Sequence, residues 1–143
     1  DVITAMQGLY RQIGVKIEPV SLAYPAALEA ARNGEHHLIP NAISSSDPDI
    51  LTPYFHSKNI ESGFAWSKFA SPELDAWLEA GAQTVDPAKR AEVYNQAQQF
   101  IMDNALIIPI RDYLNLNGAS AKVKGLRFSL QGWFPWLYDV YME

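Results

Sequence analysis

The side chains most able to do chemistry in this sequence lie in a polar segment, residues 44–66. The segment opens with three serines, residues 44–46, followed by Asp47-Pro48-Asp49. Serine acts as a nucleophile only beside a base, and no base stands near these serines in the sequence. A calcium loop would need further carboxylates at ligand spacing, and no carboxylate follows Asp49 at that spacing. We therefore expect Asp47 to make a turn and cap a helix, and the serines to form a turn or to hydrogen-bond a ligand.

The histidines and the paired carboxylates give weaker indications of a metal or catalytic site. His36 and His37 are adjacent, but neighbouring side chains on a strand point to opposite faces and cannot easily share a metal. We expect these two, and His56 in the polar segment, to be ordinary surface or edge histidines. Glu73 and Asp75 stand two residues apart on a predicted helix, so they point in different directions and do not suggest an acid–base pair. The sequence predicts no catalytic residue, no bound metal and no cofactor.

Composition narrows the classes of partner. The 143-residue chain carries a formal net charge of -5, and its lysines and arginines form no basic stripe. Such a surface repels polyanions, which argues against nucleic acid as a partner. Without cysteine, disulfides, thiolate catalysis and zinc–thiolate sites are excluded. The apolar runs are too short to span a bilayer.

The beginning of the chain alternates helical and strand patterns. Apolar residues recur at helical spacing over residues 2–13, and residues 15–22 then alternate apolar and polar as in a half-buried strand. A second helix is predicted over residues 24–32 and a second strand over residues 37–43. Helix–strand–helix–strand order favours the α/β class, with a mixed sheet flanked by helices. We expect one domain over residues 1–143.

Two helices and two strands are predicted after the polar segment. Ser71-Pro72 and Asp86-Pro87 each place a capping side chain before a proline at the first helical position. Strands are predicted over residues 106–113 and 122–128, in the same sheet as the first two. The expected apolar faces of the two helices are Leu74, Trp77 and Leu78, and Val93, Tyr94, Ala97, Phe100 and Ile101.

Ligand-facing positions are expected where the second strand ends. Sheets of α/β proteins bind ligands beyond the ends of their strands, which favours Asn41, Ser44 and Ser45, with Trp66 as a stacking wall. The chain then ends in an aromatic tail: Trp133, Phe134, Trp136, Leu137, Tyr138 and Tyr141. Three interpretations stay open for this tail, in order of preference: packing in the core, an interface with a part of the same protein outside this sequence, and contact with a ligand.

Several segments in this order resemble one family. They are AMQGLYRQIGVKIE (5–18), the Asp47-Pro48 pair, WSKFASPELD (66–75), DPAKRAEVYNQAQ (86–98), ALIIPI (105–110) and VKGL (123–126). Together they resemble the C-terminal part of extracytoplasmic solute-binding proteins of bacterial ABC importers, of the oligopeptide/dipeptide/nickel type. Phe69 stands where that family usually has tyrosine, and Ser71 where it usually has asparagine.

The resemblance implies a fold and a function. The fold would be the C-terminal lobe portion of a two-lobed periplasmic-binding-protein fold, which closes on a solute and docks on membrane permease subunits. In peptide-binding members an aspartate three residues before the Asp-Pro pair holds the peptide amino terminus, and Ser44 occupies that position here. A neutral hydroxyl cannot supply the charge-assisted bond that an ammonium needs. With Asn41 in place of the family's tryptophan, this favours a neutral or hydroxyl-rich, sugar-like solute over a peptide.

The functional prediction is therefore a solute receptor and not an enzyme. We expect it to capture a small solute such as a peptide or a sugar-like molecule, in the periplasm or outside the cytoplasmic membrane, with a lipid anchor at a missing N-terminus as one option. The rest of its own chain would be a further partner. One alternative is an α/β hydrolase or transferase domain, which would need a convergent nucleophile and base. Another is an interaction module without a ligand.

Overall fold

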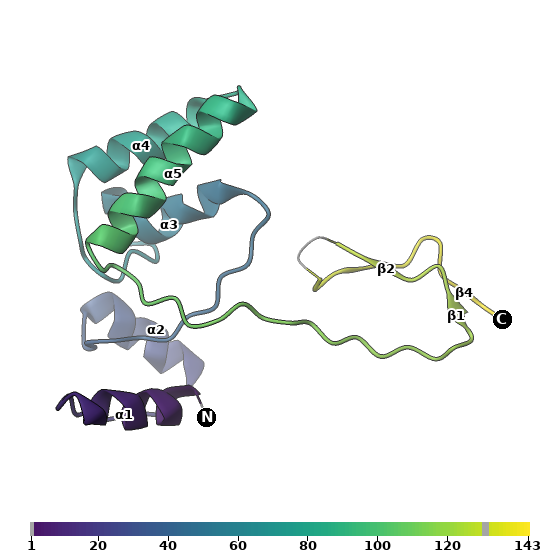
Figure 1. Cartoon of the computed structure of the whole chain (residues 1–143), viewed down its shortest axis with the longest axis horizontal. Coiled ribbons are helices and arrows are strands. Elements are labelled where there is room, and N and C mark those ends of the chain that lie inside the picture. The colour runs from purple at the N-terminus through teal and green to yellow at the C-terminus, as the bar shows by residue number, and fades with distance from the viewer. Residues whose placement is uncertain (1, 130–131) are drawn as a thin grey trace. The chain divides into compact units, whose positions relative to one another are not determined.

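The computed structural model describes residues 2–129 and 132–143 (Figure 1). Its contacts divide the chain into two compact units, Asp1–His36 and His37–Glu143. Each unit is described by itself.

The first unit consists of two helices, as predicted. Helix α1 spans Val2–Gln12 and helix α2 spans Tyr24–Asn33. Pro25 lies in the first turn of α2, where its missing N–H costs no helical hydrogen bond. Gly34 ends the helix in the left-handed conformation, with φ 74°, which glycine adopts without steric strain. The expected strand over residues 15–22 is not formed.

The second unit begins with a helical region. Asp47 and Ser71 start helical segments, and the side chain of Asp86 accepts a hydrogen bond of 2.9 Å from the Lys89 N–H at the start of the longest helix. These caps satisfy N–H groups that have no partner within their helices. The elements are the 3₁₀ helix η1 (Pro48–Ile50), α3 (Leu51–Phe55), the 3₁₀ helix η2 (Ser57–Asn59), α4 (Pro72–Gln83) and α5 (Pro87–Asp103).

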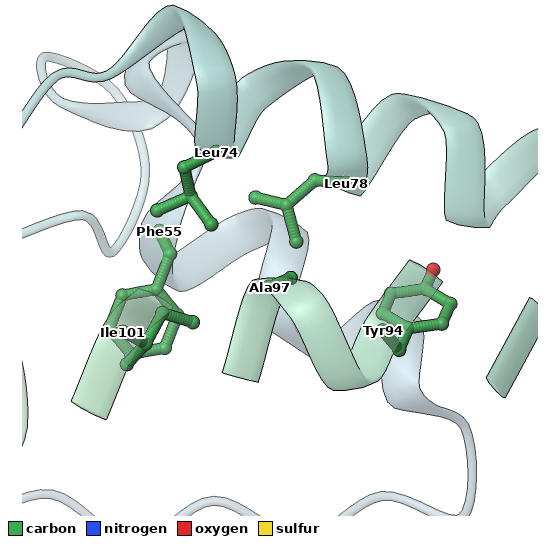
Figure 2. Packing of buried hydrophobic residues seen from close by; sticks show 6 residues of the cluster. All are labelled: Phe55, Leu74, Leu78, Tyr94, Ala97 and Ile101. Carbon is green, nitrogen blue, oxygen red and sulfur yellow. The ribbon is translucent and has the colours of Figure 1, made fainter. Parts of the chain in front are cut away.

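The core of the second unit lies where α3, α4 and α5 meet. It consists of six buried residues, and Figure 2 shows their side chains meeting between the helices. Both predicted apolar faces are confirmed except at Val93, which is half-buried outside the cluster. Trp77 and Phe100 pack against the cluster, and their rings meet edge to face at 5.5 Å. The cluster is formed by Phe55, Leu74, Leu78, Tyr94, Ala97 and Ile101.

Among the described residues, strands pair only after residue 122. Strand β1 (Val123–Lys124) pairs with β4 (Tyr141–Met142), and β2 (Arg127–Phe128) pairs with β3 (Pro135–Trp136). Both pairs are antiparallel, and they form two separate two-stranded sheets. The expected strand over residues 122–128 thus exists as two short strands.

The prediction of one mixed sheet within this chain is wrong. Residues 15–22, 37–43 and 106–113 form no strand among residues 2–129 and 132–143. Their apolar–polar patterns fit strands, but a strand also requires a neighbour whose N–H and C=O groups complete its ladder. Alternation of apolar and polar residues indicates which face of a segment could be buried. It does not indicate whether a neighbouring strand is present.

The aromatic tail does not pack into the core described above. Trp133, Phe134 and Trp136 are 55%, 68% and 60% exposed, and Tyr138 is 97% exposed. These side chains are therefore not packed in the core of the second unit, and the three interpretations of the tail stay predictions. Within the described part of the chain, no helix has the length and apolar character needed to cross a membrane.

Candidate functional site

A polar pocket of about 390 Å³ brings together three of the four predicted ligand-facing residues. Asn41, Ser44 and Ser45 lie on one wall, and Trp66 does not line the pocket. The other wall comes from a segment about 70 positions further along the chain, which the sequence analysis did not connect with this loop. The full lining is Asn41, Ala42, Ile43, Ser44, Ser45, Ser46, Arg111, Asp112, Tyr113, Asn115 and Trp133.

The serine wall is held by local hydrogen bonds. Oδ1 of Asn41 accepts a hydrogen bond of 2.9 Å from the Ala42 N–H, and Oγ of Ser45 accepts one of 3.1 Å from the Asp47 N–H. Such bonds between short polar side chains and nearby backbone fix turns. Asn41, Ser44 and Ser45 are all exposed, so their remaining donors and acceptors can reach a solute.

Asp47 ends this wall and anchors it to α5. Its Oδ1 accepts hydrogen bonds of 2.8 Å from both the Asp49 N–H and the Arg90 guanidinium. The expected turn and helix cap at Asp47 are therefore confirmed. The Arg90 hydrogen bond, followed by the Asp49 N–H, lowers the pKa of Asp47 below its ordinary value of 3.8. In return, the hydrogen bond to Asp47 raises the pKa of Arg90.

Asp49 makes a second attachment to the same helix. The Tyr94 hydroxyl of α5 donates a hydrogen bond of 3.1 Å to Oδ1 of Asp49, and the Thr52 hydroxyl donates one of 2.8 Å to the same oxygen. Burial, with the hydrogen bond to Asp49, raises the pKa of Tyr94 above 10.0. Both aspartates therefore serve to hold the loop, and this use of their oxygens explains why the Asp-Pro-Asp sequence need not mark a metal.

The second wall contributes a cation. Arg111 stacks its guanidinium over the ring of Tyr113, with the carbon 4.8 Å from the ring centroid. Residues 106–113 were predicted as a buried strand, and Arg111 was not assigned to a site. The sequence does mark Arg111 as a charged residue directly after an apolar run. It does not indicate which distant loop that residue contacts.

Trp66 lies in a separate aromatic group. Its ring meets Phe64 edge to face at 5.6 Å, and Phe64 stacks on Tyr54 at 5.3 Å. The indole Nε1 is buried without a hydrogen-bond partner in the part of the chain that the structure describes. Trp66 is thus half-buried against Phe64, and it does not line the pocket with Asn41, Ser44 and Ser45.

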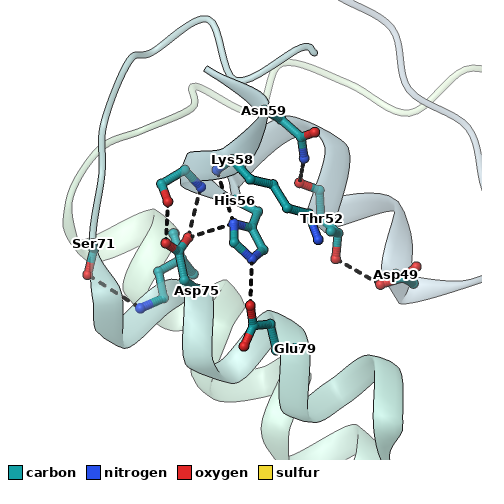
Figure 3. A network of polar contacts seen from close by, with 10 residues as sticks. Asp49, Thr52, His56, Lys58, Asn59, Ser71, Asp75 and Glu79 are labelled. Carbon is teal, nitrogen blue, oxygen red and sulfur yellow. Dashed lines mark hydrogen bonds and ion pairs between the residues drawn. The ribbon is translucent and has the colours of Figure 1, made fainter. Parts of the chain in front are cut away.

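The polar network around His56 is the arrangement most similar to a catalytic group (Figure 3). His56 is buried, with Nε2 3.2 Å from Oε1 of Glu79 and Nδ1 3.2 Å from Oδ1 of Asp75. The Ser57 N–H and hydroxyl both donate to Asp75, the former at 2.8 Å. The expectation of a surface or edge position for His56 is thus wrong.

This network lacks the geometry of an activated nucleophile. The Ser57 hydroxyl donates to the Asp75 carboxylate and not to the imidazole, so His56 is not placed to take its proton. Among residues 2–129 and 132–143, no group of three or more histidines, aspartates or glutamates could hold a metal ion. The network joins η2 to α4, and its contacts are those of a structural link between them.

Comparison with curated proteins finds binding proteins along most of the chain. It is 30% identical over 108 residues to the probable di/tripeptide-binding protein 5 of Pseudomonas aeruginosa, an alignment covering 73% of this chain and 20% of the relative. It is 29% identical over 135 residues to heme-binding protein A of Haemophilus influenzae, covering 92% and 24%. The dipeptide-binding protein of Escherichia coli is 26% identical over 123 residues, covering 84% and 23%. No family model matches the chain.

A solved structure shares the fold. HbpA2 from Haemophilus parasuis superposes with a TM-score of 0.82 at 28% identity, over 99% of this chain and 28% of that one. The chain thus spans about a fifth to a quarter of the length of these curated relatives. The predicted fold, a portion of one lobe of a periplasmic-binding-protein fold, is confirmed at this level. By sequence and by structure, the chain therefore resembles part of the extracytoplasmic solute-binding proteins of bacterial ABC importers, of the oligopeptide/dipeptide/nickel type, as predicted.

Proposed function

We propose that this chain is part of a receptor that captures a small peptide-like solute outside the cytoplasmic membrane and delivers it to the permease subunits of an ABC importer. One observation carries the proposal. The polar pocket of Asn41, Ser44 and Ser45 occurs in a chain that aligns over 73–92% of its length with proteins named for binding di- and tripeptides, dipeptides or heme. The pocket supports the proposal as a candidate position for the solute.

The location follows the same reasoning. A further relative, 30% identical over 121 residues, is named peptide transport periplasmic protein SapA of Salmonella typhimurium. A receptor that collects solutes for import works on the outer side of the cytoplasmic membrane, where the solute is. A lipid anchor stays a prediction from the sequence resemblance.

The alternatives have less support. An α/β hydrolase or transferase needs a nucleophile beside a base, and Ser57 with His56 does not provide that geometry. A sugar-like solute was inferred from Ser44 and Asn41, but the names of the relatives refer to peptides and heme. We therefore propose a peptide-like solute and not a sugar-like one.

The test is a thermal-shift screen of the complete protein that contains this chain, with calorimetry on any solute that raises its melting temperature. A ligand that binds only the native state raises the apparent stability by mass action, by about 2.7 kcal/mol at a concentration one hundred times its Kd. We expect di- and tripeptides to raise the melting temperature. A complete protein that responds to sugars and not to any peptide would contradict the proposed solute class.

A further inference from the structure

The pocket contains an arginine without an anionic partner. Of the three arginines in residues 37–143, Arg90 pairs with Asp47 and Arg127 pairs with Asp139. Within residues 2–129 and 132–143, no carboxylate lies in ion-pair distance of the Arg111 guanidinium, which is exposed on the pocket wall. An unpaired cation that lines a pocket is available to an anionic group of a ligand.

Arg111 is also held in position. Its guanidinium lies 4.8 Å from the centroid of the Tyr113 ring, and stacking of this kind leaves the edge of the planar guanidinium free to bond. Successive side chains of an extended segment point to opposite sides, and the stacking shows that Arg111 and Tyr113 share a side. Asp112 lies between them in sequence and also lines the pocket, but it forms no ion pair with Arg111 among the residues that the structure describes. The guanidinium thus keeps its charge without neutralisation by the adjacent carboxylate.

The opposite wall lacks a carboxylate. It presents the hydroxyls of Ser44 and Ser45 and the amide of Asn41, none of which is charged. Asp47 follows this wall, but its Oδ1 is already engaged by Arg90 and by the Asp49 N–H. A cationic group of a solute would find only neutral acceptors there, whereas an anionic group would find Arg111 and neighbouring hydroxyl donors.

We propose that this pocket recognises its solute through a carboxylate bound by Arg111. The inference rests on the proposed function, because it concerns the same pocket. A guanidinium and a carboxylate form two parallel hydrogen bonds, so the specificity should be for a planar carboxylate. Two classes of small solute carry that group: a peptide through its C-terminus and a heme through its propionates. The recognition chemistry is the same for both.

The experiment measures binding to the complete protein by calorimetry with matched probes. The peptide probes are Ala-Ala, N-acetyl-Ala-Ala and Ala-Ala amide, and the heme probes are hemin and hemin dimethyl ester. We expect the acid form of one class to bind about tenfold or more tightly than its amide or ester, since a hydrogen bond to a charged group contributes on the order of 1.5–3 kcal/mol. N-acetyl-Ala-Ala should still bind, because it retains the carboxylate that Arg111 contacts. The class that binds identifies the source of the carboxylate.

Three variants locate the effect. Arg111→Gln should remove the preference for acid over amide or ester, and Arg111→Lys should retain part of it. Arg127→Gln, at an arginine that pairs with Asp139 and does not line the pocket, should leave it unchanged. If the wild-type protein binds none of the carboxylate probes, both the proposed solute class and this inference are overturned. If it binds them and Arg111→Gln keeps the full acid preference, or if N-acetylation abolishes binding, the inference alone is overturned and the receptor function stands.

Discussion

The guanidinium of Arg90 lies 2.8 Å from Oδ1 of Asp47, and this contact ties helix α5 to the loop that carries Ser44 and Ser45. The same helix donates the Tyr94 hydroxyl to Asp49, two residues further along the loop. Because α5 packs on α4 through the core of Figure 2, the serine wall of the pocket is supported by the most buried part of the chain. The geometry of the pocket therefore depends on residues that do not line it.

The Asp47–Arg90 pair should make stability depend on pH in the acid range. The folded-state pKa of Asp47 lies below its ordinary 3.8, chiefly because of the hydrogen bond from Arg90. A carboxyl group with a lowered pKa contributes stability that is fully present above its unfolded pKa and is lost as the pH falls through the folded pKa. We expect Asp47→Asn to lower the free energy of unfolding at pH 7 and to have less effect as the pH falls below about 4. Urea unfolding at pH 7, 5, 4 and 3 measures this difference.

The control for that prediction is a double-mutant cycle with Arg90→Gln. If the pair acts directly, the two substitutions are not additive at pH 7, and their coupling shrinks in 1 M salt, where the screening length falls to about 3 Å. Additive effects at every salt concentration would show that Asp47 acts only as a helix cap.

Gly81 should not tolerate a side chain. A Cβ placed on Gly81 in α4 would lie 2.7 Å from Cζ and 2.8 Å from Cε2 of Tyr94, whose ring is 1% exposed. Alanine favours a helix over glycine by about 0.8–1 kcal/mol, but overpacking a core costs about 1–3 kcal/mol. We therefore expect Gly81→Ala to lower the free energy of unfolding, although alanine favours a helix more than glycine does. Urea denaturation measures this change.

Gly8 provides the matched control for this substitution. It lies in α1, and a Cβ there would have no neighbouring atom within 4 Å. Gly8→Ala should raise the helix stability by about 0.5–1 kcal/mol. Equal effects of the two substitutions would refute the close approach of Tyr94 to α4.

Asp86 should be the stronger of two helix caps. Its carboxylate accepts the Lys89 N–H at 2.9 Å, whereas the Ser71 hydroxyl accepts the Leu74 N–H at 3.3 Å. A charged acceptor at a helix N-terminus also interacts with the helix dipole. We expect Asp86→Ala to cost about 1–2 kcal/mol and Ser71→Ala about 0.5–1 kcal/mol of unfolding free energy. Asp86→Asn retains an acceptor and should cost less than Asp86→Ala; a ranking in which Ser71→Ala costs more than Asp86→Ala would contradict the geometry.

The helices were predictable from sequence because their signals are local. Ser71-Pro72 and Asp86-Pro87 start helices at the expected residues, and Gly34 ends one. The strand predictions over residues 15–22 and 106–113 failed because a strand depends on a partner that local alternation does not reveal. The same limit applies to the pocket. The loop of Ser44 and Ser45 was predicted from its turn-forming residues, whereas Arg111 lies in a segment about 70 residues further along the chain.

The last prediction concerns the 143-residue chain by itself. If a solute in this family is enclosed between two lobes, as the resemblance implies, one lobe offers only part of the polar contacts, and each lost hydrogen bond removes on the order of 1 kcal/mol. A few such losses weaken a micromolar ligand to about millimolar, because each 1.4 kcal/mol is a factor of about ten. The exposed aromatic tail, with Phe134 at 68% and Tyr138 at 97%, should meanwhile drive self-association, since large apolar patches rarely stay uncovered. Light scattering and calorimetry on the chain test both effects, with Phe134→Ser and Tyr138→Ser expected to reduce the association. A strictly monomeric chain that bound a peptide with micromolar affinity would mean that the pocket between Ser44 and Arg111 is complete without a second lobe.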